Sequence, residues 1–304
     1  EMQENCQVDN EGGKGEKNLI TFLAPKTLGA HVRKAGEDIK IGESVFGAGH
    51  RLTTIDIGIL ASLGIAQIKV YRQLTVALIA TGDELKKPGE SLTEGDIFES
   101  NSYVVSSILK KMNINVINFG VIEDDFEAIK HTFQQADQQA DAVISSGGVS
   151  VGDADYTKSV LDELGEIAFW KIAMKPGKPF AFGKLKNSIF FGLPGNPVSA
   201  LVTFHQLAIT GLLKLQNCQV EKPVNLQIKS STALKKSPGR MDFQRGVLSV
   251  NETGETVVTS TGAQGSGILS SMARANCYII LPAEQGRVEA GEKVTVQIFD
   301  QYLQ

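Results

Sequence analysis

Apolar runs alternate with amphipathic segments through the middle of the chain, between residues 73 and 216. The runs VALIA (76–80) and SIFFG (188–192) are almost continuously apolar, which is typical of strands buried on both faces of a parallel sheet. INVINFGVI and DAVISS are predicted as further strands, and a segment with helical periodicity follows each of the four. The alternation predicts repeated β-α units, in which helices cover both faces of a mostly parallel sheet.

The regions on either side are richer in β-structure. Residues 1–72 contain two predicted strands (19–25 and 65–72), a Gly-punctuated stretch (32–52) that we interpret as short strands and turns, and one helix that starts at Thr53 or Thr54. Residues 217–304 contain five short strands between turn clusters, which predict a small barrel or sandwich. We therefore expect three domains: a partial β-rich N-terminal domain (1–72), an α/β domain (73–216) and a C-terminal β-barrel domain (217–304).

The composition argues against several classes of function. The chain has 304 residues and a formal net charge of −4, whereas nucleic-acid-binding proteins usually carry a basic face. Its three cysteines are far apart and form no CxxC pair, so neither a disulfide scaffold nor a structural zinc site is indicated, and a reducing cytoplasm is favoured. No uninterrupted apolar run reaches the roughly 18 residues of a membrane-spanning helix, so no membrane association is expected.

Four loops that follow predicted strands carry most of the candidate functional residues. They are TGDE (81–84), EDD (123–125), SSGGVSVGDAD (145–155) and LPGNP (193–197). Each alone also fits a simple helix N-cap, and for the first two loops that is the stronger interpretation. Ligands of such sheets bind outside the carboxyl ends of the strands, so we expect the four loops to meet at one rim and bind a phosphate-rich ligand.

The stretch SSGGVSVGDAD combines donors for an anion with two carboxylates. Gly147 and Gly148 are expected to turn their backbone N–H groups towards a phosphate. Asp153 and Asp155 are candidate ligands of a divalent cation bound to the same phosphate. Three hydroxyls add donors: Ser145, Ser146 and Ser150. The alternative is a glycine turn followed by an aspartate helix cap.

A loop with three lysines is a second candidate anion site. Lys171, Lys175 and Lys178 fall within eight residues of the chain, and Pro176 and Pro179 keep this loop out of a regular helix. Three ammonium groups on a stiff loop suit a polyanion, although a solvated charged face is the usual reading of such a run.

The start of the long helix after LPGNP is a third candidate anion site. Asn196 is its predicted N-cap, Pro197 suits its first position, and Ser199 adds a hydroxyl in its first turn. Nucleophilic catalysis finds little support, because the four histidines lie outside these loops and no G-x-S-x-G, Walker A or G-x-G-x-x-G sequence occurs.

Together, these and neighbouring stretches resemble the molybdopterin molybdenumtransferase (MoeA) family, whose relatives include the E domain of gephyrin. The matching stretches are RKAGEDI, GHRLTTIDIGILASLGI, ATGDEL, SNSYVV, ISSGGVSVGDADYTK, MKPGKPFAFG, GLPGNPVSALVTF and STGAQGSGILSSMARAN. They span residues 33 to about 276. SSGGVSVG, KPGKP and GLPGNPVSA in this order are highly specific together.

The resemblance implies a three-layer αβα molybdopterin-binding domain, flanked by a β-rich N-terminal domain and a C-terminal β-barrel. It implies an enzyme of molybdenum cofactor biosynthesis that inserts molybdate into adenylylated molybdopterin and releases AMP, aided by Mg²⁺. It also implies a cytoplasmic homodimer that acts on small molecules, contacts the molybdopterin adenylyltransferase, and binds neither nucleic acid nor membrane.

The resemblance also implies roles for individual residues. Asp124 and Asp155 would hold Mg²⁺ at the AMP phosphate, with Glu84 nearby. The ligand phosphates would lie against Ser145, Ser146, Gly147, Gly148 and Ser150. Further binding positions would be Lys171, Lys175, Lys178, Asn196, Ser199, Arg240 and Ser266. Arg33 and Asp38 would serve the site from another domain.

Two other interpretations stay open at this point. A molybdopterin adenylyltransferase or a CinA-like nucleotide enzyme shares the TGDE and SGG regions but lacks the flanking β domains. A non-enzymatic scaffold of the gephyrin kind would bind a receptor peptide. Because the family has a further segment, of about one domain, before the point that matches residue 1, we expect these 304 residues by themselves to bind ligand weakly or to be inactive.

Overall fold

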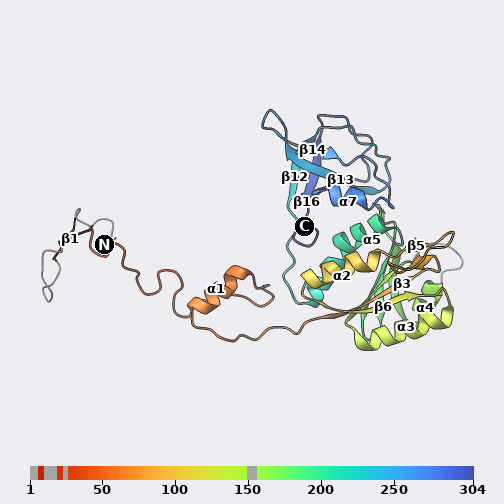
Figure 1. Ribbon diagram of the computed structural model, residues 1–304, viewed down its shortest axis with the longest axis horizontal. Helices are drawn as coiled ribbons and strands as arrows, with labels where there is room; N and C mark the ends of the chain where they lie inside the picture. Colours follow the sequence, from red (N-terminus) through yellow and green to blue (C-terminus); the bar gives the residue numbers. More distant parts are fainter. Residues whose placement is uncertain (1–5, 10–18, 23–26, 149–155) are drawn as a thin grey trace. The chain divides into compact units, whose positions relative to one another are not determined.

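The computed structural model describes residues 6–9, 19–22, 27–148 and 156–304, and the chain forms two compact units, Glu1–His50 and Arg51–Gln304 (Figure 1). In the first unit, β1 (Cys6–Asp9) pairs antiparallel with β2 (Leu19–Phe22), as the expected β-rich domain requires. The stretch 32–50 contains turns and no strand, so the short strands predicted there are wrong.

The second unit begins with the predicted helix, α1 (Thr54–Ser62). Thr53 caps it, because the Thr53 hydroxyl accepts from the Asp56 N–H while the Asp56 carboxylate accepts from the Thr53 N–H. Gly64 follows the last turn with a φ of 71°, the left-handed conformation that ends many helices. Residues 65–72 form no strand, contrary to the prediction. They are exposed and pair with no described strand, and apolar alternation without a hydrogen-bonding partner does not make a sheet.

A six-stranded sheet with the order β6-β3-β7-β11-β10-β8 forms the centre of the second unit. Four strands are parallel: β6 (Asn115–Ile122), β3 (Thr75–Thr81), β7 (Ala142–Ser146) and β11 (Ile189–Leu193). Antiparallel pairing adds β10 (Pro179–Leu185) and β8 (Gly165–Lys171) at one edge. The sequence analysis missed these two, because their lysine and glycine residues interrupt the apolar pattern.

Helices cover both faces of this sheet, so the predicted three-layer αβα arrangement is confirmed (Figure 1). One face packs against α2 (Asn101–Lys111) and a long helix composed of α5 (Pro197–Thr203), the π-helical turn η2 (Phe204–Ala208) and α6 (Ile209–Leu215). The other face packs against α3 (Phe126–Gln139) and α4 (Tyr156–Leu164). Val76 and Leu78 of β3 belong to the first core, and Ala77 and Ile79 to the second, as the two-residue period of a strand requires.

The long helix is apolar enough to raise the question of a membrane span. By length and composition alone, the helix Pro197–Leu215 is long and apolar enough to cross a membrane. However, 61% of its most apolar stretch is buried inside the protein. Val198, Phe204 and Leu212 are completely buried in the core beside the sheet. Packing within the protein therefore accounts for its apolar character.

The C-terminal region is a closed barrel and not a sandwich, the other arrangement that its short strands allowed. Its strands are β14 (Thr256–Ser260), β12 (Asn225–Ser230), β16 (Lys293–Ile298), β15 (Cys277–Leu281) and β13 (Met241–Val250). The barrel closes because β13 pairs with β14 as well as with β15. The barrel and the helix layer share one hydrophobic cluster, to which Phe243, Tyr278 and Phe204 belong.

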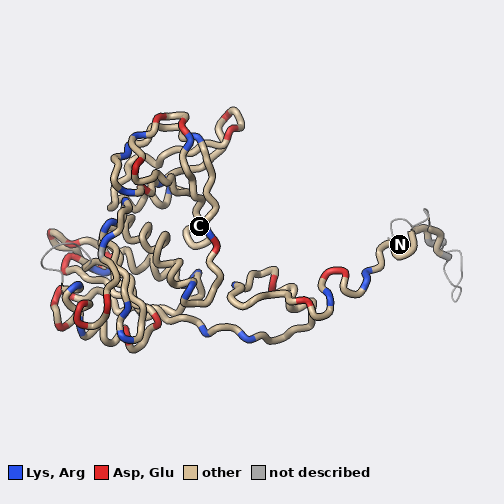
Figure 2. Tube along the Cα trace, turned by 180° about the vertical axis from the view of Figure 1, so that it is seen from behind, with Lys and Arg blue, Asp and Glu red and all other residues tan. Residues whose placement is uncertain are grey.

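Four short elements complete the second unit. β4 (Leu85–Lys86) and β5 (Ile97–Phe98) pair with each other after β3. β9 (Met174–Lys175) pairs with the start of β13, and α7 (Ser270–Arg274) packs against β13. Basic and acidic residues are interspersed along the second unit (Figure 2). The domain limits at residues 72 and 216 stay predictions.

Candidate functional site

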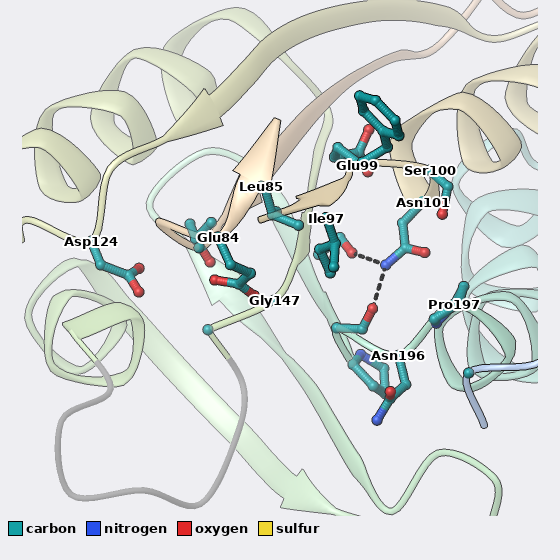
Figure 3. Close-up of a pocket in the computed structure, with 18 of the residues that line it drawn as sticks. Glu84, Leu85, Ile97, Glu99, Ser100, Asn101, Asp124, Gly147, Asn196 and Pro197 are labelled. Carbon is teal, nitrogen blue, oxygen red and sulfur yellow. Dashed lines mark hydrogen bonds between the residues drawn. The ribbon is translucent and has the colours of Figure 1, made fainter. Parts of the chain in front are cut away.

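The four polar loops meet in one pocket of about 610 Å³ at the carboxyl ends of the parallel strands (Figure 3). Thr81, Gly82 and Glu84 follow β3, and Asp124 follows β6. The other two loops contribute Ser146, Gly147 and Gly148 after β7, and Pro194, Gly195, Asn196 and Pro197 after β11. The prediction that these loops share one rim is therefore confirmed, since parallel strands bring their carboxyl ends to one edge.

Two glycines allow β7 and β3 to approach closely at this rim. Gly147 has a φ of 88° and Gly148 a φ of 61°, values that other residues rarely adopt. A Cβ on Gly147 would lie under 3.0 Å from the carbonyl oxygen of Thr81, and one on Gly148 would lie 2.8 Å from the Thr81 hydroxyl. The Gly147 N–H donates to Leu193 O at 3.2 Å, so the expectation that this N–H faces a phosphate is wrong. The structure needs glycine there for its backbone conformation and its lack of a side chain.

Three buried hydroxyls gather beside these glycines. Thr81, Ser145 and Thr157 are each at most 3% exposed, and their hydroxyl oxygens have no hydrogen-bond partner among the residues described. Buried hydroxyls without a partner are unusual, because each loses its hydration without replacement. Of the three, Thr81 lines the pocket, so its hydroxyl is available there to a polar ligand or an ordered water.

Three carboxylates line the pocket, and two of them, Glu84 and Asp124, lie at one end while the third is Glu99. Figure 3 shows Glu84 and Asp124 on the same side of Gly147, and the Asp124 N–H donates to Asp83 Oδ1 at 3.0 Å. Burial raises the pKa of Asp124, and the nearby charges of Asp83 and Glu84 raise it further. A cation bound here would relieve that repulsion. Asp153, Asp155 and Ser150 lie outside the described residues, and in the described part of the chain no three acidic, histidine or cysteine side chains cluster as a metal site.

Asn101 joins three parts of the pocket, and the sequence analysis did not select it. Its Nδ2 donates to Ser146 Oγ at 2.7 Å and to Gly195 O at 2.8 Å (Figure 3). The start of α2 is thereby tied to the loops after β7 and β11. Glu99, which is buried, caps the same helix by accepting from the Ser102 N–H at 2.8 Å. The polar run ESNS before an amphipathic helix was the available signal, but only the fold reveals what Asn101 contacts.

The three lysines lie apart from the lining of this pocket as far as the structure describes it. Lys171 ends β8 and is exposed, and Lys178 is exposed in the loop before β10. Lys175, in β9, forms an ion pair with the buried Asp242 of the barrel, with Nζ and Oδ2 3.4 Å apart. The lysine loop therefore lies beside the start of the barrel.

The predicted site residues of the long helix and the barrel are only partly brought together. Asn196 is in the capping position of α5, although its side chain makes no capping hydrogen bond. Ser199 is buried one turn further on. Ser266 O accepts from the Val198 N–H at 2.9 Å, which places a barrel loop at the start of α5, and the neighbouring Gly267 lines the pocket. Arg240 is exposed before β13.

Arg33 and Asp38 belong to the first compact unit, where both are exposed. Their predicted contribution to the site stays a prediction. His205 of η2 is buried, and its Nε2 lies 3.1 Å from Asp300 Oδ2. It therefore belongs to the contact between the long helix and the end of the barrel.

Comparison with known proteins places the whole chain in one family. Residues 77–214 match the probable molybdopterin binding domain, residues 1–64 the MoeA N-terminal region (domains I and II), and residues 227–299 the MoeA C-terminal region (domain IV). The molybdopterin molybdenumtransferase of Haemophilus influenzae is 46% identical over 303 residues, which are 99% of this chain and 74% of that protein.

More distant relatives agree with this assignment. The molybdopterin molybdenumtransferase of a Nostoc species is 33% identical, over 95% of this chain and 67% of its own length. The crystal structure of a molybdopterin biosynthesis MoeA protein from Pyrococcus horikosii superimposes with a TM-score of 0.75 at 30% identity, covering 98% of this chain and 71% of that one. The chain therefore belongs to the molybdopterin molybdenumtransferase (MoeA) family.

Proposed function

We propose that this protein acts in molybdenum cofactor biosynthesis as a molybdotransferase, which inserts molybdate into adenylylated molybdopterin and releases AMP. One observation carries the proposal: loops from four parallel strands meet in a single pocket that combines carboxylates with buried hydroxyls. The 46% identity to a molybdopterin molybdenumtransferase over 303 residues supports the same activity. Matches to the flanking MoeA regions argue against an adenylyltransferase or a CinA-like enzyme, both of which lack those domains.

The glycine end of the pocket is the proposed phosphate site. The Gly148 N–H and the hydroxyls of Thr81, Ser145 and Ser146 would donate to phosphate oxygens. Ser150 would complete this cradle. The oxygen that attacks the pyrophosphate link would come from water or molybdate, and the protein would bind and orient the reactants.

The carboxylate end is the proposed Mg²⁺ site, with Asp124 and Asp155 as ligands and Glu84 nearby. Oxygen donors are the ligands that Mg²⁺ prefers, and the raised pKa of Asp124 reflects a local excess of negative charge that a cation would offset. When bound, Mg²⁺ would neutralise the pyrophosphate and stabilise the charge of the departing AMP.

The remaining predicted residues form the proposed molybdate and pterin side of the site. Molybdate is an oxyanion, so the ammonium groups of Lys171, Lys175 and Lys178 are suited to it. The other proposed contacts are Asn196, Ser199, Arg240 and Ser266, with Arg33 and Asp38 contributed from another domain. The barrel loop at the start of α5 supports a site that extends towards the C-terminal region.

We further propose a cytoplasmic homodimer that contacts the molybdopterin adenylyltransferase. The exposed apolar side chains of Ile55 and Ile57 in α1, and of Leu63 directly after it, support a subunit contact, since a partner would remove them from water. Sedimentation of the protein and of an Ile55→Asp, Ile57→Asp variant tests this. A monomer for the unaltered chain would contradict the proposal.

Incubation of the full chain with adenylylated molybdopterin, molybdate and Mg²⁺ tests the activity. The expected result is molybdate-dependent AMP release, measured by chromatography, together with molybdenum on the pterin, measured by mass spectrometry, both at the low level expected of these 304 residues by themselves. A Lys175→Ala, Lys178→Ala variant is expected to lose molybdate binding in calorimetry. Unchanged molybdate affinity, or AMP transfer from ATP to molybdopterin without molybdate insertion, would contradict the proposed function.

A further inference from the structure

The lysine loop, residues 171–178, is attached to the barrel by its backbone. β9 lies beside β13 in parallel, and the Met241 N–H donates to Ala173 O at 2.9 Å. In this register Lys175 is level with Asp242. The backbone that carries Lys175 is therefore fixed relative to β13.

The side chain of Lys175 is held as well. Its Nζ donates to Asp242 Oδ2 at 3.4 Å, whereas neither Lys171 nor Lys178 has a side-chain partner among the residues that the structure describes. The Asp242 side chain is 4% exposed and that of Lys175 is 46% exposed. Because an ammonium group has three hydrogens, Lys175 can donate to Asp242 and still offer two donors to a ligand on its exposed side.

Asp242 is itself restrained inside the barrel. Gln244, which is buried, donates from Nε2 to Asp242 Oδ2 at 3.3 Å and to Lys235 O at 2.9 Å. The buried guanidinium of Arg245 is a second cation whose charge interacts with this carboxylate. A carboxylate held in this way provides a fixed anchor for the Lys175 ammonium group.

We propose that Asp242 is a positioning residue that makes the lysine loop selective for molybdate over smaller oxyanions of the same charge. The inference rests on the proposed function, in which Lys175 binds molybdate. A free lysine side chain loses rotamer freedom when it binds an anion, whereas Lys175 has lost part of that freedom already. A fixed donor suits one ionic size, whereas a free ammonium group adjusts to several.

The charge of Asp242 acts in the opposite direction from its positioning role. A carboxylate beside Lys175 offsets the lysine charge and so weakens the attraction for every anion. Molybdate and sulfate are both tetrahedral dianions, and molybdate is the larger because Mo–O bonds are longer than S–O bonds. The charge therefore changes both affinities alike, and the ratio of the two affinities reports the position of the ammonium group.

Equilibrium dialysis of the full chain against radiolabelled molybdate or sulfate tests the proposal. The unaltered chain is expected to bind molybdate about fivefold or more tightly than sulfate. Asp242→Asn, which keeps the shape of the side chain and can still accept from Gln244, is expected to lower this ratio to about one. Asp242→Glu keeps the charge and moves it by one methylene, so it is expected to lower the ratio as well.

Glu255→Gln is the matched control. Glu255 pairs with Lys229 in the same barrel, with Oε1 and Nζ 2.7 Å apart, and neither residue is among the proposed site residues. The substitution therefore removes one carboxylate and one lysine ion pair without touching the lysine loop. The ratio of the molybdate and sulfate affinities is expected to stay unchanged.

A double-mutant cycle separates positioning from a purely structural role. If Asp242 acts through Lys175, adding Asp242→Asn to Lys175→Ala leaves the affinity ratio where Lys175→Ala alone has put it. Disturbance of Arg245 or of the barrel would change the ratio in the Lys175→Ala background too. A change in that background overturns the proposal.

The remaining outcomes also decide the proposal. A lower ratio in the two Asp242 variants, with no change in the control, supports it, and Asp242→Glu decides alone if Asp242→Asn does not fold. If the unaltered chain binds molybdate and sulfate equally, or if the Asp242 variants keep its ratio, the positioning role is overturned while the proposed function stands. If the unaltered chain binds no molybdate, the proposed molybdate site is overturned together with the positioning role.

Discussion

Replacing Gly147 by alanine should destabilise the α/β domain and damage the pocket. The Gly147 backbone has a φ of 88°, and the new Cβ would lie under 3.0 Å from the Thr81 carbonyl oxygen. Neither group is free to move, because the Gly147 N–H is bonded to Leu193 O and β3 and β7 are hydrogen-bonded neighbours. Relief of the contact therefore requires the strands to separate at the rim.

The expected magnitude follows from two contributions. A left-handed conformation costs a residue with a Cβ about 1–2 kcal/mol, and forcing one extra carbon into a close-packed contact costs about 1–3 kcal/mol. Their sum is a loss of about 2–5 kcal/mol in the free energy of unfolding. The unfolding equilibrium constant should rise by roughly 30-fold or more.

Urea denaturation followed by far-UV circular dichroism measures this loss. Gly195→Ala is the matched control in the same pocket, since its Cβ would meet only Gly147 Cα, at 3.9 Å. We expect a change of less than about 1 kcal/mol for the control. Equal urea midpoints for Gly147→Ala and the unaltered chain would refute the packing argument.

Three other side chains give further tests. Burial, with help from neighbouring carboxylates, raises the pKa of Asp124, so the folded protein holds this proton more tightly and loses stability as pH rises above the ordinary aspartate range. Asp124→Asn should therefore raise the unfolding temperature at pH 7 without Mg²⁺, and no gain there would contradict the assignment. Asp137 accepts four hydrogen bonds from Asn187 and Ser188. Asp137→Ala should cost about 2–4 kcal/mol in urea denaturation without changing phosphate affinity, and a cost below about 1 kcal/mol would count against this network. Burial raises the pKa of the Cys277 thiol to about 12, so iodoacetamide at pH 8 should label half-buried Cys218 and spare Cys277 in peptide mass spectrometry; equal labelling rates would disprove this.

The central sheet could be predicted from the sequence because its inner strands are buried on both sides. VALIA lies in β3, where alternate residues enter two different cores, and such strands must be apolar throughout. The convergence of the polar loops could be predicted for a related reason, since the carboxyl ends of parallel strands share one edge. The strands β8 and β10 could not, because lysine and glycine residues interrupt their apolar pattern. Of the two, β8 is the edge strand, where polar residues are usual.

The strand predicted at residues 65–72 is wrong because pairing between strands cannot be inferred from one segment alone. Its apolar alternation is like that of a strand, but no described strand lies beside it to accept hydrogen bonds. Asn101 illustrates the opposite case. Nothing in its local sequence distinguishes it from a helix-cap residue, and its partners Ser146 and Gly195 lie 45 and 94 residues further along the chain.

The sequence by itself determined the family, the order of the α/β and β regions, and which loops gather at the rim, because periodicity, turn residues and motif order are local properties of the chain. Only the tertiary structure decided how those loops are joined. It showed that Gly147 is needed because a side chain there would prevent close packing of β7 against β3, and that its N–H donates to Leu193 O. It also showed that Lys175 pairs with Asp242 of the barrel and that Asn101 ties three elements together. These contacts join residues far apart in sequence, so they depend on the register of strands and helices that forms only when the whole core is packed.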